Sequence, residues 1–295
     1  MQLLIFILVY PFIWLLSILP MRILYLISDF LYLILYYVVG YRKKVVRHNL
    51  ELVFPEKSAE ERLVIEKKSF HHFVDIFMEM IKTFTISEKE ISKRFVFKNL
   101  ETLNYFYNNN KSLIIMAMHY ANWEWVISIS LRNLVSHQGY VAYKMIENKY
   151  FNKKMKASRS KFNGIMIPTS ELLDLIQKND INNKLSIYGL LSDQSPLLKK
   201  THYWSDFLGV NVPIHTGAEM LAKKYDYPVL YLHTERVKRG YYESTVEVLA
   251  EHPREFKDYE ITDIFLHKLE DQIRKEPAYY FWTHNRFKHM DKSKS

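Results

Sequence analysis

Short apolar runs alternate along this chain with longer stretches of helical spacing, a pattern that predicts an α/β fold. The apolar runs that we interpret as strands lie at residues 95–97, 113–118, 140–143, 165–167, 185–191, 228–232 and 244–248. The stretches that we interpret as helices lie at 42–85, with a break at 54–58, and at 99–109, 122–134, 149–161, 170–178, 216–225 and 260–275. This alternation indicates a mostly parallel sheet flanked by helices.

The first 40 residues differ from the rest in being almost uncharged and strongly apolar. Residues 3–20 carry no charge and are close to the minimum length for crossing a bilayer, although Pro11 would kink such a helix. Residues 23–39 contain Asp29 and several tyrosines, a composition typical of an interfacial helix. We therefore predict a membrane anchor at 1–40 and a catalytic domain at 41–295. The alternative is a pair of buried core helices.

The composition favours an anionic binding partner but does not identify its class. The 295 residues carry 41 Lys and Arg against 32 Asp and Glu, a formal net charge of +9, which favours an anionic membrane surface, acidic protein or nucleic acid. The basic residues are dispersed and match no common nucleic-acid motif, so we expect no nucleic-acid partner. There are no cysteines, which excludes disulfides and thiolate metal sites. We expect no metal and no cofactor.

The most informative position is His119, which follows the apolar run at 113–118. Open α/β sheets bind ligands at the carboxyl ends of their strands, and His119 would lie at such an end. Asn122 is placed to cap the next helix, and Glu124 would lie in its first turn, within hydrogen-bonding reach of the imidazole. A carboxylate on Nδ1 fixes the tautomer and makes Nε2 the stronger base. The alternative is a structural histidine with an acid beside it.

The chain offers that base no nucleophile of its own. It contains no Gly-x-Ser-x-Gly elbow and no cysteine. A hydroxyl of the substrate would then be the nucleophile, deprotonated by His119 and attacking an acyl donor directly. Other polar residues follow or lie between the neighbouring strands, and their convergence with His119 is an expectation: Lys144, Arg159, Asp193 and Gln194.

With these features together, the chain resembles the bacterial late acyltransferases of lipid A biosynthesis. The resemblance covers nearly the whole chain. It rests on an ordered set of segments at 47–56, 119–124, 193–194, 207–222 and 280–288. The segment His119-Tyr-Ala-Asn-Trp-Glu124 matches the catalytic motif of the family, in which glycine usually precedes the asparagine. Here Ala121 takes that place, and an alanine is strained there if the position requires a positive φ.

The resemblance implies acyl transfer from an acyl carrier protein to a hydroxyl of a lipid A precursor or related lipid. His119 would be the general base, Glu124 its orienting partner, and Asn122, Lys144, Arg159, Asp193 and Gln194 would bind substrate. The enzyme would lie on the inner membrane and face the cytoplasm. A lysine at position 144, where an arginine is expected, leaves other acceptors open, among them lysophospholipids and aminolipids. A catalytically inactive membrane scaffold is the remaining alternative.

Overall fold

The protein is built on one seven-stranded sheet, whose strands lie in the order β1-β9-β8-β2-β5-β3-β4. The computed structural model describes residues 1–132 and 137–290. Its sheet consists of β1 (Phe95–Phe97), β2 (Leu113–Ala117), β3 (Gln138–Tyr143), β4 (Ile165–Pro168), β5 (Ser186–Leu191), β8 (Val229–Lys238) and β9 (Tyr241–Ala250). Neighbouring strands are parallel except β8 and β9, which form an antiparallel hairpin. The predicted α/β fold with a mostly parallel sheet is confirmed.

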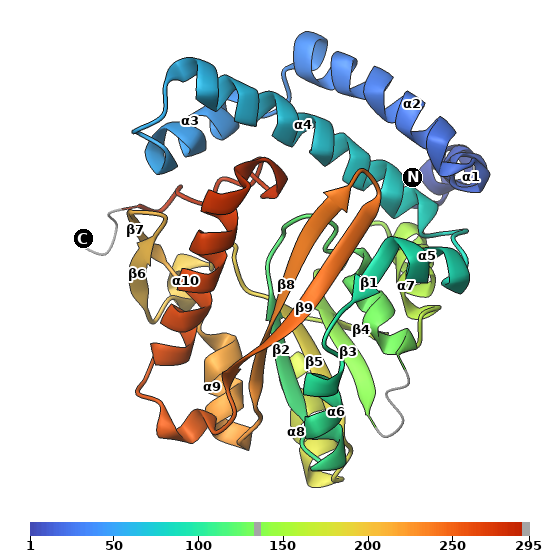
Figure 1. The fold of residues 1–295 in the computed structure, drawn as a ribbon. Coiled ribbons are helices and arrows are strands. Elements are labelled where there is room, and N and C mark those ends of the chain that lie inside the picture. The colour runs from blue at the N-terminus through green and yellow to red at the C-terminus, as the bar shows by residue number, and fades with distance from the viewer. Residues whose placement is uncertain (133–136, 291–295) are drawn as a thin grey trace.

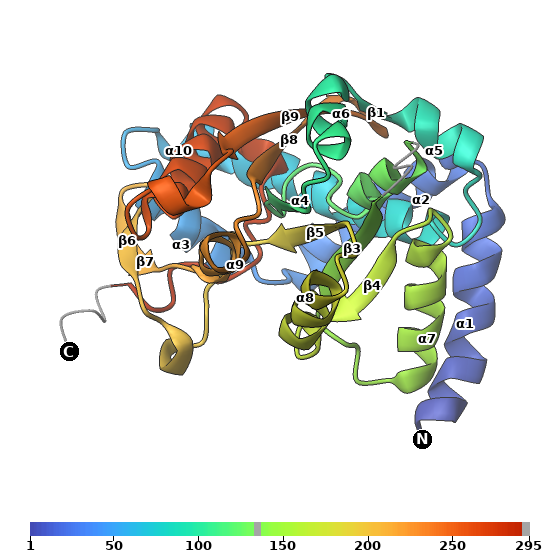
Figure 2. The same ribbon diagram turned by 90° about the horizontal axis from the view of Figure 1, so that it is seen from below.

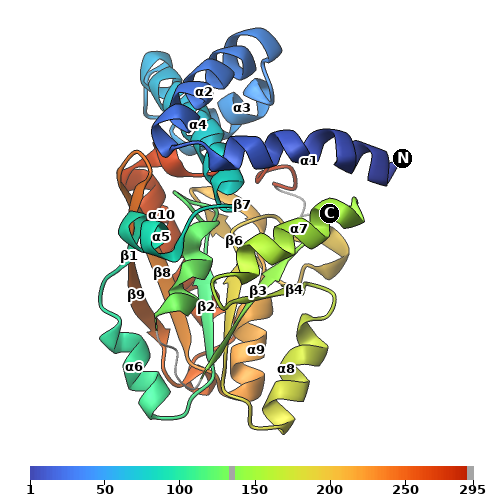
Figure 3. The same ribbon diagram turned by 90° about the vertical axis from the view of Figure 1, so that its right-hand side faces the viewer.

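The sheet is covered on both faces, which explains the continuous apolar character of its central strand. All five residues of β2 are buried, as expected for a parallel strand with helices on either side. Figures 2 and 3 show α6 (Glu101–Asn108) on one side of the sheet, and α7 (Lys149–Ser160) and α8 (Leu172–Ile181) on the other. Two further helices, α9 (Gly217–Tyr225) and α10 (Glu260–Lys275), match predicted stretches closely.

The structure also contains elements that the hydrophobic pattern did not predict. These are α5 (Glu88–Arg94), the small antiparallel pair β6 (Trp204–Phe207) and β7 (Val210–Pro213), and single turns at η3 (Leu198–Lys200), η4 (Pro253–Glu255) and η5 (Pro277–Tyr279). Each is too short to show a period. The helix predicted at 122–134 is a 3-10 helix, η2 (Trp125–Leu131), and residues 133 and 134 lie outside the described residues.

The N-terminal helices lie at the carboxyl end of the parallel strands. Figure 1 shows α4 (Ala59–Lys82) crossing above the sheet, at the end toward which β8 points, with α2 (Met21–Leu33) beyond it and α3 (Lys43–Val53) beside one end of α4. Phe54 to Ser58 separates α3 from α4, as predicted. Ser58 accepts a hydrogen bond from the Glu61 amide, and Glu61 accepts one from the Ser58 amide. The predicted capping box is therefore present.

The apolar N-terminus forms α1 (Gln2–Ile18), α2 and a π-helical continuation, η1 (Ile34–Val39). By length and composition, Met21–Val39 is long and apolar enough to cross a membrane, whereas Gln2–Ile18 is shorter. Large apolar side chains remain exposed, including Phe12 (69%), Leu26 (68%) and Phe30 (62%). This exposure disfavours a buried core pair and supports association with a membrane.

The two helices are nonetheless attached to the rest of the chain. Helix α2 packs on α4, and α1 contacts both α4 and α7. Figure 2 shows α1 running beside α7, where Phe6 packs on the rings of Tyr150 and Phe151. The division into an anchor at 1–40 and a catalytic domain at 41–295 remains a prediction.

The capping box gives a direct test of how α4 begins. Replacing Ser58 with alanine removes an acceptor for an otherwise unpaired amide, so we expect Ser58→Ala to lower the free energy of unfolding by about 1 kcal/mol. The measurement is thermal unfolding of the detergent-purified protein. Ser58→Thr keeps the hydroxyl and is the matched control. Equal losses in both variants would contradict a role for this hydrogen bond.

Candidate active site

The candidate site is formed where two neighbouring parallel strands end. In the register of β2 and β5, Ala117 is opposite Leu191, and each is the last residue of its strand. His119 and Asp193 each lie two residues further on, so the two side chains are brought together. The Nδ1 atom of His119 lies 2.7 Å from Oδ1 of Asp193. The register therefore builds a histidine–carboxylate pair from residues 74 positions apart in the chain.

Burial and charge act in opposite directions on this pair. Burial disfavours the charged imidazole, but the charge and hydrogen bond of Asp193 outweigh it, so the pKa of His119 is raised above its ordinary value. For Asp193, burial favours the neutral carboxyl, but His119 and nearby backbone amides prevail and the pKa of Asp193 is lowered. Asp193 thus stays ionised and holds the proton of the neutral ring on Nδ1.

The second nitrogen of His119 is left as a hydrogen-bond acceptor. The side-chain amide nitrogen of Gln194 lies 3.3 Å from Nε2. The His119 side chain is 18% exposed, so part of the ring can be reached from outside the protein. Its ring stacks on Phe281, with centroids 5.8 Å apart, and meets the edge of Trp123 at 5.5 Å. An Nε2 lone pair in an aromatic setting with limited access to water is suited to accept a proton from a substrate hydroxyl.

The structure corrects the expected partner of His119. Glu124 does not form the predicted hydrogen bond with the imidazole; instead its two oxygens accept hydrogen bonds from Nε and Nη2 of Arg159, at 2.8 and 2.7 Å. Arg159 lies on α7, and both side chains are largely buried. Glu124 remains near enough to raise the pKa of His119 through its charge. The pairing occurs because the planar fork of an arginine fits a carboxylate better than one imidazole nitrogen does.

Two other predicted site residues have different surroundings from those expected. Asn122 is fully buried, accepts a hydrogen bond from the Trp125 amide as the predicted cap, and donates one to Oε2 of Glu79 at 2.6 Å. Both polar atoms of the Asn122 side chain are therefore used to stabilise the turn after His119. Lys144 follows β3, is exposed, and makes no hydrogen bond or ion pair within the described part of the chain.

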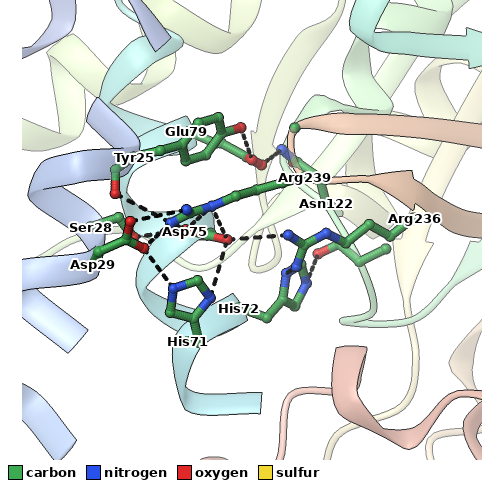
Figure 4. A network of polar contacts seen from close by, with 12 residues as sticks. Tyr25, Ser28, Asp29, His71, His72, Asp75, Glu79, Asn122, Arg236 and Arg239 are labelled. Atoms are coloured by element: carbon green, nitrogen blue, oxygen red, sulfur yellow. Dashed lines mark hydrogen bonds and ion pairs between the residues drawn. The ribbon is translucent and has the colours of Figure 1, made fainter. Parts of the chain in front are cut away.

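A polar network joins α2, α4 and the β8–β9 hairpin (Figure 4). Its centre is Asp75 on α4, which is 0% exposed and pairs with Arg236 and Arg239 from the β8–β9 hairpin. Arg239 also pairs with Asp29 of α2 at 2.6 Å. Glu79, one turn beyond Asp75, accepts hydrogen bonds from Tyr242 and from Asn122. Burial raises the pKa of Glu79 to about 7, and the charge of Asp75 adds to the effect.

The network reaches the site through His72. Nδ1 of His72 accepts from Arg236 at 3.0 Å, and its Nε2 donates to the carbonyl of Ala121 at 3.2 Å. Burial, assisted by the charge of Arg236, lowers the pKa of His72, so the ring is neutral with its proton on Nε2. The amide of Ala121 donates to the carbonyl of Tyr279. The turn at residue 121 is thus held from both sides.

Sequence reasoning assigned no site role to the network or to the aromatic wall formed by Trp123 and Phe281. A signal for the network was present, since Asp75 and Glu79 interrupt the apolar face of α4 at adjacent turns. Phe281 belongs to the segment 280–288, whose backbone lies beside the end of β2, where its amide donates to the His119 carbonyl. Within residues 1–132 and 137–290, no group of three or more acidic or histidine side chains is arranged to hold a metal ion.

A histidine at a strand end with a carboxylate on its Nδ1 fits the class of enzymes that remove a proton from a substrate hydroxyl with a general base. Comparison with known proteins agrees with that class: residues 1–289 match the model of the bacterial lipid A biosynthesis acyltransferases, and the chain belongs to this family. It is 24% identical, over 84% of its length and 79% of the relative's, to the lipid A biosynthesis palmitoleoyltransferase of Escherichia coli (strain K12). A lipid A biosynthesis acyltransferase of Shigella flexneri matches to the same extent. The family assignment supports a membrane lipid acyltransferase.

The backbone at Ala121 allows a test of local strain. Ala121 has a φ of 49°, which confirms the positive value that a glycine would adopt without cost. We expect Ala121→Gly to raise the free energy of unfolding by about 1 kcal/mol, measured by thermal unfolding. Ala278→Gly is the control, because that buried alanine is outside the positive-φ set and should lose stability. A loss at both positions would contradict strain at Ala121.

Proposed function

We propose that this protein transfers a fatty acyl chain from an acyl carrier protein thioester to a hydroxyl of a lipid A precursor or related membrane lipid. His119 is the general base and Asp193 its orienting carboxylate. The observation that carries the proposal is the 2.7 Å contact between Nδ1 of His119 and Asp193, which leaves Nε2, now contacted by the Gln194 amide, as the acceptor of the ring. The family assignment supplies the substrate class.

The proposed reaction needs only one proton shuttle. Nε2 of His119 takes the proton of the acceptor hydroxyl as its oxygen attacks the thioester carbonyl carbon. The tetrahedral intermediate collapses with cleavage of the carbon–sulfur bond, and the imidazolium returns the proton to the departing thiolate. The products are an ester on the lipid and the free thiol of the carrier. Asp193 stabilises the transient imidazolium by its negative charge.

The other predicted residues take supporting roles in this proposal. Gln194 holds Nε2 of His119 until the acceptor hydroxyl replaces it. The pair of Arg159 and Glu124 fixes the turn after His119 to α7, and Lys144 is available for an anionic substrate group. The acidic carrier protein would approach the basic protein, whose net charge is +9, by electrostatic attraction. We place the enzyme on the inner membrane, with its site facing the cytoplasm.

The first test is a lipid mass spectrum after incubation with acyl carrier protein thioesters and a lipid A precursor. We expect a product heavier by one acyl chain with the wild type, and a loss of at least about 10²-fold in rate with His119→Ala, since the variant lacks the proton acceptor. Full activity in His119→Ala would contradict the base assignment.

The same experiment separates the alternatives. If the precursor is not acylated, lysophospholipids and aminolipids are offered in its place. Acylation of one of these assigns another membrane lipid as acceptor, and no product with any of them favours the inactive scaffold. His119→Ala must keep the wild-type unfolding temperature for its loss of activity to be interpreted chemically.

The pH profile tests which carboxylate orients His119. A general base works when neutral, so activity is present above its pKa and is lost as the pH falls through it. Because the pKa of His119 is raised, the acid limb of kcat/KM should lie above about 6.5. In Asp193→Asn the attraction of the carboxylate is gone while burial remains, so the limb should move to lower pH and kcat should fall by about 10²-fold or more.

Glu124→Gln is the matched comparison, because it neutralises the other nearby carboxylate. The charge of Glu124 contributes less to the raised pKa of His119 than that of Asp193 does, so the acid limb should move less. A larger shift in Glu124→Gln than in Asp193→Asn would return the orienting role to Glu124, as the sequence suggested.

A further inference from the structure

The structure contains a second pocket, next to the candidate active site, that the proposed chemistry does not use. It has a volume of about 380 Å³ and is lined by Tyr32, Lys67, Lys68, His71, Arg236 and Tyr279. These residues come from α2, from α4, from the β8–β9 hairpin and from the segment next to His119. Four of the six carry, or can acquire, a positive charge.

The lysines of this pocket are not neutralised by the protein. The nearby acids are already engaged, since Asp75 pairs with Arg236 and Arg239, and Asp29 with Arg239 and His71. Glu66, beside Lys67 in sequence, is buried and pairs with Arg47 on the side of Tyr36. Within the described residues, neither Lys67 nor Lys68 has a hydrogen bond or ion pair. The pocket therefore has two uncompensated positive charges.

The lysines of the pocket lie close to His71 because of their spacing along α4. Lys67 and Lys68 precede His71 by four and three residues, so each lies next to His71 on the surface of α4. Tyr32 meets the ring of His71 edge-on at 5.1 Å, and Arg236 lies 5.0 Å from the centre of the Tyr279 ring. Figure 4 shows His71 and Arg236 among the buried network that fixes them. Two lysines without a partner among the described residues thus lie beside side chains that are held in position.

The side chains around the pocket indicate which kind of anionic ligand it fits. Lys67 and Lys68 follow Leu63 and Val64 by one helical turn, and these apolar side chains are exposed. On the α2 side, Leu33 next to Tyr32 is exposed as well. Apolar surface around a cationic pocket fits a lipid, whose chains cover the apolar side chains while its phosphate meets the lysines.

The pocket is also joined to the candidate active site. Tyr279 lines it and also lines a neighbouring aromatic pocket that includes Trp123 and Phe281, the two rings packed against His119. We infer that the pocket of Lys67, Lys68, His71 and Arg236 binds the phosphate of an anionic membrane lipid. Under the proposed function, this lipid is the acyl acceptor, held by its phosphate while a hydroxyl reaches His119.

The test measures lipid binding by the full-length, detergent-purified protein in the absence of any acyl donor. The probes are dihexanoyl phosphatidic acid and dihexanoyl phosphatidylcholine, titrated by calorimetry. We expect the wild type to prefer phosphatidic acid, and Lys67→Gln/Lys68→Gln to weaken its binding by about tenfold or more, because two charge-assisted contacts are lost. Lys199→Gln/Lys200→Gln removes an exposed lysine pair of η3, outside this pocket, and should bind like the wild type.

Three outcomes would overturn the inference. One is equal affinity for the two lipids, and another is an equal loss in the two double variants. The third is displacement of phosphatidic acid by inorganic phosphate at similar concentration, which would assign the pocket to free phosphate. Because no turnover is involved, failure of acyl transfer leaves this result intact. If acyl transfer is observed, Lys67→Gln/Lys68→Gln should raise KM for the phosphorylated acceptor and largely retain kcat.

Discussion

The buried carboxylate of Asp75 is the constraint on which the arrangement around the site depends. A charge removed from water must be paired, and Asp75 takes its partners from the tip of the β8–β9 hairpin. Arg239 also donates to Asp29 on α2. One unexposed carboxylate on α4 therefore ties the apolar N-terminal helices to the sheet. Loss of both arginines would leave this buried charge without a paired cation, which is far more costly than the loss of a surface ion pair.

The same network reaches the turn that carries His119. Arg236 fixes the tautomer of His72, and His72 holds the carbonyl of Ala121, whose positive φ turns the backbone after β2. Asn122 is held in turn by Glu79. The membrane-associated helices and the strand end are consequently parts of one polar structure. Under the proposed function, this connection fixes the position of His119 relative to the apolar N-terminal helices.

Two neighbouring pockets of different character share Tyr279 in this part of the structure. Trp123 and Phe281 pack against His119, where the proposed function places the acyl chain and the new ester bond. Uncompensated lysines line the neighbouring pocket beside exposed apolar helices. A phosphorylated lipid has both kinds of surface. Under the proposed function, the charges of Lys67 and Lys68 position the acceptor, and the imidazole of His119 removes its proton in surroundings poor in water.

The sequence by itself determined the strands of the sheet, most of the helices, the capping box at Ser58 and the position of His119 at a strand end, because each depends on local periodicity or on neighbouring residues. The unusual backbone at Ala121 was also visible, as an alanine where glycine is usual. The partner of His119 was not, since Asp193 reaches it only through the register of β2 and β5, and sequence proximity favoured Glu124. In the folded protein Glu124 instead pairs with the guanidinium of Arg159 on α7. Tertiary structure also determined the partners of Asp29, Asp75 and Glu79, because the residues that pair with them are distant in the chain.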